Sequence, residues 1–389
     1  MAVETKTQVK TYFQTGDTPT EAQFINLIDS LGGTQQGIDA TYDIQPANEG
    51  ATAGDARGEN SVDLQTIRSA STQVAGGANS VISGGQNNTA GGDHSTVSGG
   101  STNTATSFFG HSTVSGGASN NAGGGHSTVG GGYGNTASAY YNGYSTVSGG
   151  QSNTASGDHS TVSGGYGNNA SSQYSTVSGG NGNTASGTSS IVGGGYGNTA
   201  SGYRSTVSGG QNNTASGVFS TVSGGYGNNA SAIYSTVVGG RYAKADKHGQ
   251  AAHAAGQFDA QGDAQTSVLV ARKVTTDATA NVELFLDGSA ARATIATDTT
   301  WKFTIDVVAR RTDADNESAG YKFEGVLDNN AGTTALVGNI TKVEYEDTAA
   351  WDATVEADDT NDALVVKVTG ENAKTIRWVA RIQLVEVTG

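Results

Sequence analysis

The sequence predicts an all-β chain: a β-solenoid of fifteen-residue repeats, with a short helix before it and a β-sandwich or jelly roll after it. Two observations predict this fold class. Between residues 82 and 237, phrases of the type STVSGG and NTAS recur at a fixed period, which is typical of a solenoid. From residue 267 the apolar residues instead alternate with polar ones, as they do along a strand.

Each repeat carries an apolar anchor and, eight residues later, an alanine. The anchors are Ile82, Val97, Val114, Val129, Val147, Val162, Val177, Val192, Val207, Val222 and Val237. Eight and seven residues fit two short strands per coil, with anchor and alanine inward and paired glycines such as Gly99 and Gly100 in the turns. The opposite phase, with the Thr and Ser residues inward, also fits the pattern.

One valine and one alanine per coil bury little apolar surface. At roughly 25 cal/mol per Å² such a coil gains a few kcal/mol, whereas each ordered residue costs about 1 to 2 kcal/mol of backbone entropy. We therefore expect hydrogen-bonded ladders along the solenoid and lateral packing of several copies into a homo-oligomer.

Charge divides the chain into segments. Between residues 71 and 240 the charged residues are Asp93, Asp158 and Arg204, so the net charge of −15 comes from the two ends. An acidic balance argues against a nucleic-acid partner. The sequence has no cysteine, no apolar run of membrane-spanning length and no signal-peptide run in MAVETKTQVK. We expect no membrane insertion and no cofactor.

These shifts predict four segments. Residues 1–33 form an attachment segment, residues 34–60 a linker, residues 61–266 the solenoid and residues 267–389 the antiparallel sandwich. In the first segment TPTE begins a helix by a capping box, and Gly32 and Gly33 end it. Its apolar stripe, which we expect to mediate oligomerisation or attachment to a larger assembly, comprises Phe24, Leu27, Ile28 and Leu31.

The last segment alternates in NVELFL, WKFTIDVVA, YKFEGVL, ALVVKV and TIRWVARIQLVEV, which are separated by turn residues. Several strands at short spacing indicate a sandwich or jelly roll. We expect two core rows, one on each of two strands. They are Trp301, Phe303, Ile305 and Val307, and Ile376, Trp378, Ala380, Ile382 and Leu384.

STVSGGYGNNAS and ISGGQNNTAGG resemble the head repeats of trimeric adhesins and their relatives in bacteriophage fibres, over about residues 60 to 265. YFQTGDTPTEAQFINLIDSL resembles the start of phage tail-fibre proteins, and YKFEGV and KTIRWVA are similar to their terminal domains. The resemblance implies a left-handed β-roll, a homotrimer and a place on the virion, joined to other virion structural proteins through the amino-terminal segment. Bacterial adhesins of this type carry a signal peptide, a coiled-coil stalk and a membrane anchor, which we do not recognise here, so a phage fibre is favoured.

Some fibres carry hydrolases, so acidic clusters in this chain are candidates for catalytic or metal-binding residues. Two acidic clusters lie between strands: Asp313, Asp315 and Glu317, and Asp358, Asp359 and Asp362. The first has the alternate spacing of a calcium loop but lacks its glycine. No serine, histidine and acid constellation stands out. We predict no catalytic residue, no metal site and no enzymatic activity.

Aromatic residues recur at two places in the repeat. Three residues before the anchors stand His94, His111, His126, Tyr144, His159, Tyr174, Ser189, Arg204, Phe219 and Tyr234. Four residues after alternate anchors stand Tyr133, Tyr166, Tyr196 and Tyr226. Variable size at a fixed place indicates outward positions, suited to mutual stacking, to contacts between subunits or to sugar rings.

Two coils break the period with insertions, and each insertion carries an aromatic pair. The pairs are Phe108 with Phe109 and Tyr140 with Tyr141. We predict that these residues contact a receptor, because loops that bulge from a regular scaffold commonly carry function. Filling a groove between subunits is the competing interpretation.

Together these features predict an adhesive phage tail fibre that binds a host cell-surface glycan or protein, most simply a saccharide, or presents a tip that does. The alternatives are a capsid fibre, a bacterial surface adhesin and a solenoid that binds ice through its Thr and Ser array, which Thr96 and Ser98 represent.

Overall fold

The computed structural model describes residues 57–139, 143–314 and 317–389. Every regular element in these ranges is a β-strand, and no helix there is long and apolar enough to span a membrane. The expected helix with Phe24, Leu27, Ile28 and Leu31 lies outside the described residues. The chain divides into two compact units, residues 1–152 and 153–389.

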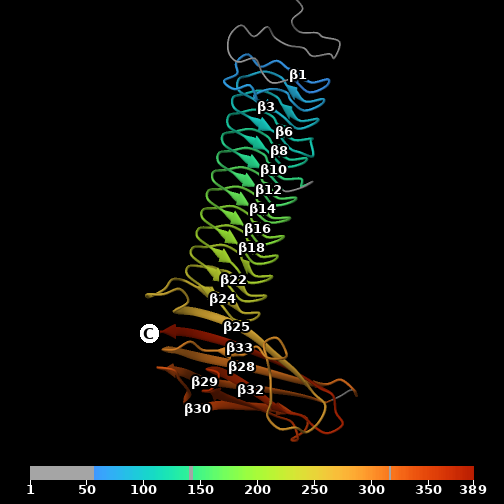
Figure 1. Cartoon of the computed structure of the whole chain (residues 1–389). Helices are drawn as coiled ribbons and strands as arrows, with labels where there is room; N and C mark the ends of the chain where they lie inside the picture. The colour runs from blue at the N-terminus through green and yellow to red at the C-terminus, as the bar shows by residue number, and fades with distance from the viewer. Residues whose placement is uncertain (1–56, 140–142, 315–316) are drawn as a thin grey trace, which may run out of the picture. The chain divides into compact units, whose positions relative to one another are not determined.

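In the first unit, two-residue strands stack in parallel to form a β-solenoid (Figure 1). The anchor strands are β1 (Val62–Asp63), β2 (Val81–Ile82), β4 (Thr96–Val97), β6 (Thr113–Val114), β8 (Thr128–Val129) and β10 (Thr146–Val147). The alanine strands are β3 (Thr89–Ala90), β5 (Thr104–Ala105), β7 (Asn121–Ala122) and β9 (Thr136–Ala137).

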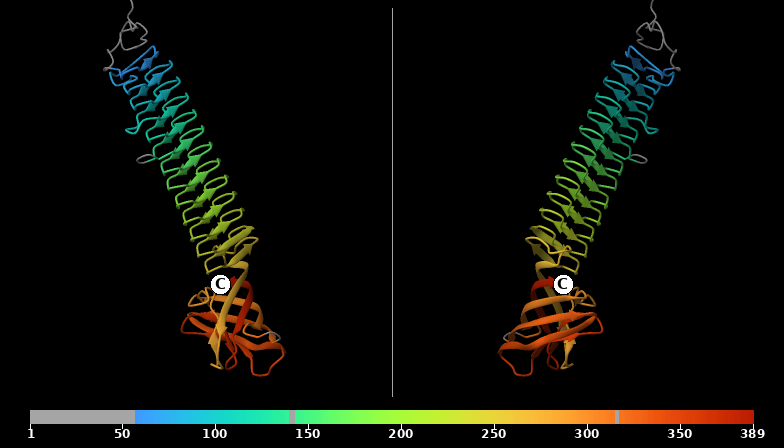
Figure 2. Two further views of the ribbon diagram at one scale, coloured as in Figure 1. Left: turned by 90° about the vertical axis from the view of Figure 1, so that its right-hand side faces the viewer. Right: turned by 90° about the vertical axis from the view of Figure 1, so that its left-hand side faces the viewer.

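The second unit repeats this architecture, and both views in Figure 2 show its successive coils. The anchor strands are β12 (Thr161–Val162), β14 (Thr176–Val177), β16 (Ile191–Val192), β18 (Thr206–Val207), β20 (Thr221–Val222), β22 (Thr236–Gly240) and β24 (Ala251–Ala254). The alanine strands are β11 (Thr154–Ala155), β13 (Asn169–Ala170), β15 (Thr184–Ala185), β17 (Thr199–Ala200), β19 (Thr214–Ala215), β21 (Asn229–Ala230) and β23 (Lys244–Ala245). The predicted solenoid is confirmed, with about 13 turns in all.

The inside of each coil contains buried polar side chains beside the anchor and the alanine. The anchors and alanines have 0% exposure, which confirms the predicted inward phase. The serine two residues before each anchor is buried as well, and so is the asparagine six residues after each anchor except Val237, as Ser95 and Asn103 are in one coil. Thr96 is half-buried and Ser98 is exposed. Four side chains per coil, not two, therefore fill the solenoid.

The buried asparagines form a hydrogen-bonded ladder along the coils. Asn183 is representative: its Nδ2 donates to the carbonyl oxygens of Gly179 and Gly195, both at 2.9 Å. Its Oδ1 accepts the backbone N–H of Asn198 at 3.0 Å. Each asparagine thus satisfies backbone groups of its own coil and the next, which buried polar groups require. The ladder supplies part of the stabilisation that the apolar core lacks.

The carboxyl-terminal part of the second unit is an antiparallel sandwich. One sheet has the order β25 (Ala264–Thr275), β33 (Ile376–Thr388), β28 (Thr299–Arg311), β29 (Ser318–Asn330) and β30 (Thr333–Glu346). The other sheet places β31 (Asp352–Asp358) on one edge of β32 (Ala363–Thr369), with β26 (Val282–Glu283) and β27 (Ala293–Thr294) on its other edge. Strand β24 of the last coil pairs with β25, so solenoid and sandwich share a hydrogen-bonded connection.

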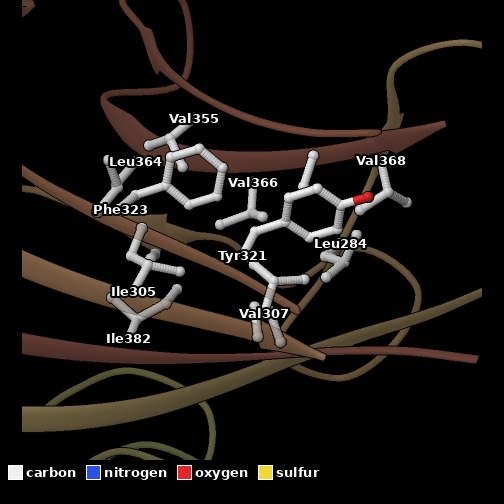
Figure 3. Close-up of a cluster of buried hydrophobic side chains, with 14 of the residues drawn as sticks. Leu284, Ile305, Val307, Tyr321, Phe323, Val355, Leu364, Val366, Val368 and Ile382 are labelled. Carbon is white, nitrogen blue, oxygen red and sulfur yellow. The ribbon is translucent and has the colours of Figure 1, made fainter. Parts of the chain in front are cut away.

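The core of the sandwich lies between the two sheets. Both rows expected from the sequence belong to one buried cluster, so their prediction as core is confirmed. Figure 3 shows the rings of Tyr321 and Phe323 between side chains of β31 and β32, including Val355 and Val366, and Ile305 and Val307 of their own sheet.

Candidate receptor-binding site

The outward aromatic row lies at a corner of the coil where the backbone is left-handed. The residue three places before the anchor has a φ between 53° and 60° at His94, His111, His126, His159, Tyr174, Ser189, Arg204, Phe219 and Tyr234. This conformation costs an L-residue roughly 1 to 2 kcal/mol unless it is glycine, with asparagine and histidine penalised less. Bulky residues such as Tyr174, Arg204 and Phe219 thus stand where the backbone disfavours them.

A second left-handed corner in the same coils provides the contrast. Five residues after the anchors stand Asn87, Thr102, Ser119, Gly134, Ser152, Gly167, Gly182, Gly197, Asn212, Gly227 and Tyr242, which apart from the last are small. Even at the first corner, the terminal coils carry Asn60, Asn79 and Gly249. The fold itself can therefore be made with small residues at these corners. Strain that is kept in the middle coils points to a role for the side chains.

The corner side chains stack on one another along the coils. In the first unit, ring centroids lie 4.9 Å apart for His94 and His111, 4.9 Å for His111 and His126 and 4.6 Å for His126 and Tyr144. In the second unit, Phe219 and Tyr234 stack at 5.2 Å. Because most of these rings are exposed, each unit has a line of aromatic edges and faces open to solvent.

The second aromatic row is also outward. Tyr133, Tyr166 and Tyr196 are each more than half exposed. Near the end of the solenoid, the guanidinium of Arg241 lies over the rings of Tyr226 and Tyr242, with its Cζ 5.4 and 5.0 Å from the two centroids. The prediction that both aromatic positions face outward is correct.

The predicted contact residues Phe108 and Phe109 border a cleft. Phe108 is 96% exposed and Phe109 42% exposed, and their rings meet edge to face at 5.3 Å. The cleft has a volume of about 320 Å³, and its lining is Ser107, Phe108, Phe109, Gly123, Gly125, Ser138 and Ala139. Two apolar rings beside a hollow floored by small residues can receive the face of a flat ligand. Tyr140 and Tyr141 lie outside the described residues.

The acidic clusters mostly serve their own loops. Asp313 and Glu317 both bind the guanidinium of Arg311, at 2.8 and 3.0 Å. The Asp358 carboxylate accepts backbone N–H groups of its own turn, and Asp362 accepts the Thr334 hydroxyl. Within residues 57–139, 143–314 and 317–389 no three acidic, histidine or cysteine side chains are placed to hold a metal ion.

One further cleft, which the sequence did not indicate, is lined by three acidic residues, Asp246, Asp263 and Glu386. It has a volume of about 220 Å³ and is lined in part by Asp246, Lys247, Trp301 and Glu386. Burial raises the pKa of Glu386, although the Ser267 hydroxyl and the charge of Lys247 oppose the rise. Burial opposes ionisation of Asp246 too, but the ammonium groups of Lys247 and Lys244 lower its pKa below the usual value. The two environments thus shift the pKa values of Glu386 and Asp246 in opposite directions.

Comparison with known proteins gives distant structural neighbours. No family model matches the chain, and no curated protein matches it. Among solved structures it is similar to the tailspike protein gp49 of the Acinetobacter baumannii bacteriophage Fri1, described as a capsular polysaccharide depolymerase, with 8% identity, a TM-score of 0.21 and coverage of 84% of this chain and 67% of that one. The Acinetobacter baumannii phage AM24 tailspike protein is 7% identical, with a TM-score of 0.24 and coverage of 85% of this chain and 67% of that one. The Acinetobacter phage vB_ApiP_P1 tailspike protein is 9% identical, with a TM-score of 0.25 and coverage of 85% of this chain and 80% of that one. Such TM-scores do not establish a common fold.

The prediction that the chain is not an enzyme is not retained, because the first of these neighbours is described as a capsular polysaccharide depolymerase. The sequence reasoning behind that prediction considered too few types of catalysis. A missing serine, histidine and acid constellation excludes one type of catalysis, whereas glycoside cleavage generally uses two carboxyl groups that need no fixed sequence spacing. Two carboxyl groups far apart in the sequence that line one cleft, as Asp246 and Glu386 do, cannot be recognised from sequence spacing.

Proposed function

We propose that the chain is an adhesive fibre component of a phage particle and that its outward aromatic side chains bind saccharide on the host surface. The observation that carries the proposal is the retention of bulky residues, such as Tyr174 and Phe219, at left-handed corners. Small residues fill the second left-handed corner of the same coils, apart from Tyr242 in the last of them. Selection for side-chain contacts explains this contrast, because the folded backbone gains nothing from bulk there.

Saccharide is the ligand class that these surfaces fit. The apolar faces of sugar rings stack on aromatic rings, and the stacked rows repeat every coil as a polysaccharide repeats along its length. The cleft beside Phe108 and Phe109 is of a size typical for small ligands, whose pockets begin at about 300 Å³. Because Phe108 is 96% exposed, its ring is free to contact a ligand.

The resemblance to phage fibres supports the remaining parts of the proposal. Residues 1–33, with the stripe of Phe24, Leu27, Ile28 and Leu31, attach the chain to other virion proteins. Three copies assemble about one axis, and the particle surface is the location. Attachment to the capsid in place of the tail is the alternative.

The test is binding of the purified full chain to surface polysaccharides extracted from a panel of bacteria, measured by biolayer interferometry. Replacing Phe108 and Phe109 with alanine is expected to weaken binding about 5- to 150-fold, since stacking contributes about 0.5 to 1.5 kcal/mol for each of the two aromatic contacts. Ser98→Ala, on an exposed residue of the solenoid, is the control. Unchanged binding in the double variant would reject the cleft, and no binding to any polysaccharide would reject the proposed function.

A second candidate function, cleavage of a glycosidic bond by water, rests on the cleft that contains Asp246 and Glu386. The Glu386 carboxyl would protonate the leaving oxygen and the Asp246 carboxylate would take a proton from the attacking water, which balances the reaction. Release of reducing ends from polysaccharide by the wild-type chain, lost in Glu386→Gln, would support it. Equal release by both proteins, or none by either, would remove it.

A further inference from the structure

A cleft on the carboxyl-terminal sandwich concentrates positive charge on an otherwise acidic chain. The cleft has a volume of about 290 Å³. It forms where β25 pairs with β33, and Arg272, Lys273 and Val274 lie opposite Val379, Trp378 and Arg377. These six residues and Gly288 line it, so three of its seven lining residues are cations and none is acidic. The chain as a whole has a net charge of −15.

The cations of this basic cleft are not neutralised by carboxylates. Arg272 donates to the carbonyl oxygens of Leu286 and Asp287, at 3.3 and 2.9 Å, and these contacts orient its guanidinium without cancelling its charge. Lys273 lies over the ring of Phe285, with Nζ 5.4 Å from the centroid. Within the part of the chain that the structure describes, neither they nor Arg377 form an ion pair.

The acidic residue nearest in sequence to the lining is Asp287, and its carboxylate is hydrogen-bonded within its own turn. The Asp287 carboxylate accepts the backbone N–H groups of Ser289, Ala290 and Ala291 and the Ser289 hydroxyl. These hydrogen bonds hold the pKa of Asp287 far below its usual value, and they engage its oxygens in its own turn. An anion in the cleft would therefore meet three cations and no competing acid from the lining.

The rest of the lining is apolar. Val274 and Val379 are 51% and 46% exposed, whereas Trp378 is fully buried beneath them. A bare phosphate or sulfate would leave this apolar surface unused. A ligand that joins a carboxylate to a ring with an apolar face would use both, because guanidinium groups bind carboxylates well and sugar rings pack on apolar side chains.

We propose that this cleft binds the carboxylate of an acidic sugar unit, of the uronic acid type, within a surface saccharide. The inference rests on the proposed saccharide binding and adds a second site with a defined ligand class. Arg272 and Arg377 pair with the carboxylate, and the valines contact the ring. A positively charged cleft lets an acidic chain hold an acidic polymer that it would otherwise repel.

The test compares two polymers with one backbone: polygalacturonate and its highly methyl-esterified form, in which the carboxylates are masked. The full chain is expected to bind the first more tightly than the second, and less tightly when salt rises from about 50 to about 300 mM. Arg377→Gln removes a side chain that makes no hydrogen bond or ion pair within the described residues, so the fold should persist. It is expected to weaken polygalacturonate binding at least fivefold, and Arg272→Gln with Arg377→Gln at least tenfold.

Arg381→Gln is the matched control, because Arg381 is exposed on the same strand, β33, outside the cleft. Equal affinity for the two polymers, or no difference between Arg377→Gln and Arg381→Gln, would overturn the proposal. So would a change of oligomeric state in Arg377→Gln without a change in polymer affinity, which would assign the cleft to subunit contact. If neutral polysaccharide still binds through Phe108 and Phe109, only the acidic-sugar site fails, and the proposed function stands.

Discussion

Replacing one buried asparagine should weaken the solenoid measurably, and Asn183 is the best position to test. In Asn183→Ala the carbonyl of Gly179 loses the Nδ2 donor at 2.9 Å, and the N–H of Asn198 loses its acceptor at 3.0 Å. Gly195 keeps a partner, since its carbonyl also accepts the N–H of Asn181. The Asn198 N–H is buried, so the loss of its acceptor costs about 1 to 3 kcal/mol. The Gly179 carbonyl is half-buried and can be hydrated in part, so the expected loss in the free energy of unfolding is about 1 to 4 kcal/mol in all.

The assay can separate the solenoid from the sandwich. All three tryptophans lie between residues 301 and 378, so their fluorescence reports the sandwich, whereas far-ultraviolet circular dichroism reports every strand. During urea unfolding of Asn183→Ala, the dichroism transition should move to lower urea and the fluorescence transition should move less. Asn181→Ala, at an exposed residue of the same coil, is the control and should change stability by no more than about 0.5 kcal/mol. Equal stability of the two variants would refute the ladder as a source of stability.

Three other perturbations follow from the same geometry. Gly180→Ala should destabilise the solenoid by several kcal/mol, because the φ of Gly180 is 87° and a Cβ there would lie 2.2 Å from the Gly195 carbonyl oxygen. A Cβ at Gly209 would meet no atom within 4 Å, so Gly209→Ala should be tolerated in the same urea titration. Tyr174→Gly should be about 1 kcal/mol more stable than Tyr174→Ala in thermal unfolding, because both lose the ring and only glycine relieves the left-handed strain. Burial raises the pKa of Glu386 in the folded chain. As pH rises above the unfolded-state pKa of about 4.3, the folded chain therefore loses stability relative to the unfolded chain, and the melting temperature falls. Glu386→Gln should reduce this fall.

Each of these predictions can fail clearly. An equal loss of stability in Gly180→Ala and Gly209→Ala would mean that the close approach of Gly180 to the next coil does not exclude a larger residue there. A Tyr174→Gly variant no more stable than Tyr174→Ala would show that the left-handed backbone at this corner is not strained, and the proposed function would lose its main support. A melting temperature with the same pH dependence in Glu386→Gln and in the wild-type chain would show that the pKa of this carboxyl does not change on folding.

The solenoid could be predicted because the repeat places chemically similar residues at one position of every coil. Anchors and alanines stand in fixed register, and strand geometry turns both inward, as their burial confirms. The interior asparagines were missed because polar residues near glycines suggest turns. The available signal was regularity: asparagine stands six residues after each anchor from Asn88 to Asn228, whereas the neighbouring positions vary.

One of the candidate sites could be located from the sequence, and the other features became visible only in the structure. An insertion can be counted, so Phe108 and Phe109 could be located from the period alone. Left-handed strain at Tyr174 requires backbone angles, which a pattern of residues does not contain. The basic cleft depends on the pairing of Arg272 with Val379 and of Val274 with Arg377, residues about a hundred positions apart. Sequence separation of that size gives no register between strands, so only the folded sandwich shows the cleft.

The central claim, that this chain is a fibre on a phage particle, is tested most directly by labelling intact particles with a gold-conjugated antibody against residues 267–389. Electron microscopy should show label on projecting fibres, and pre-incubation with the purified chain should abolish it. Particles that carry no label, while the same antibody detects the chain free in the lysate, would contradict the claim.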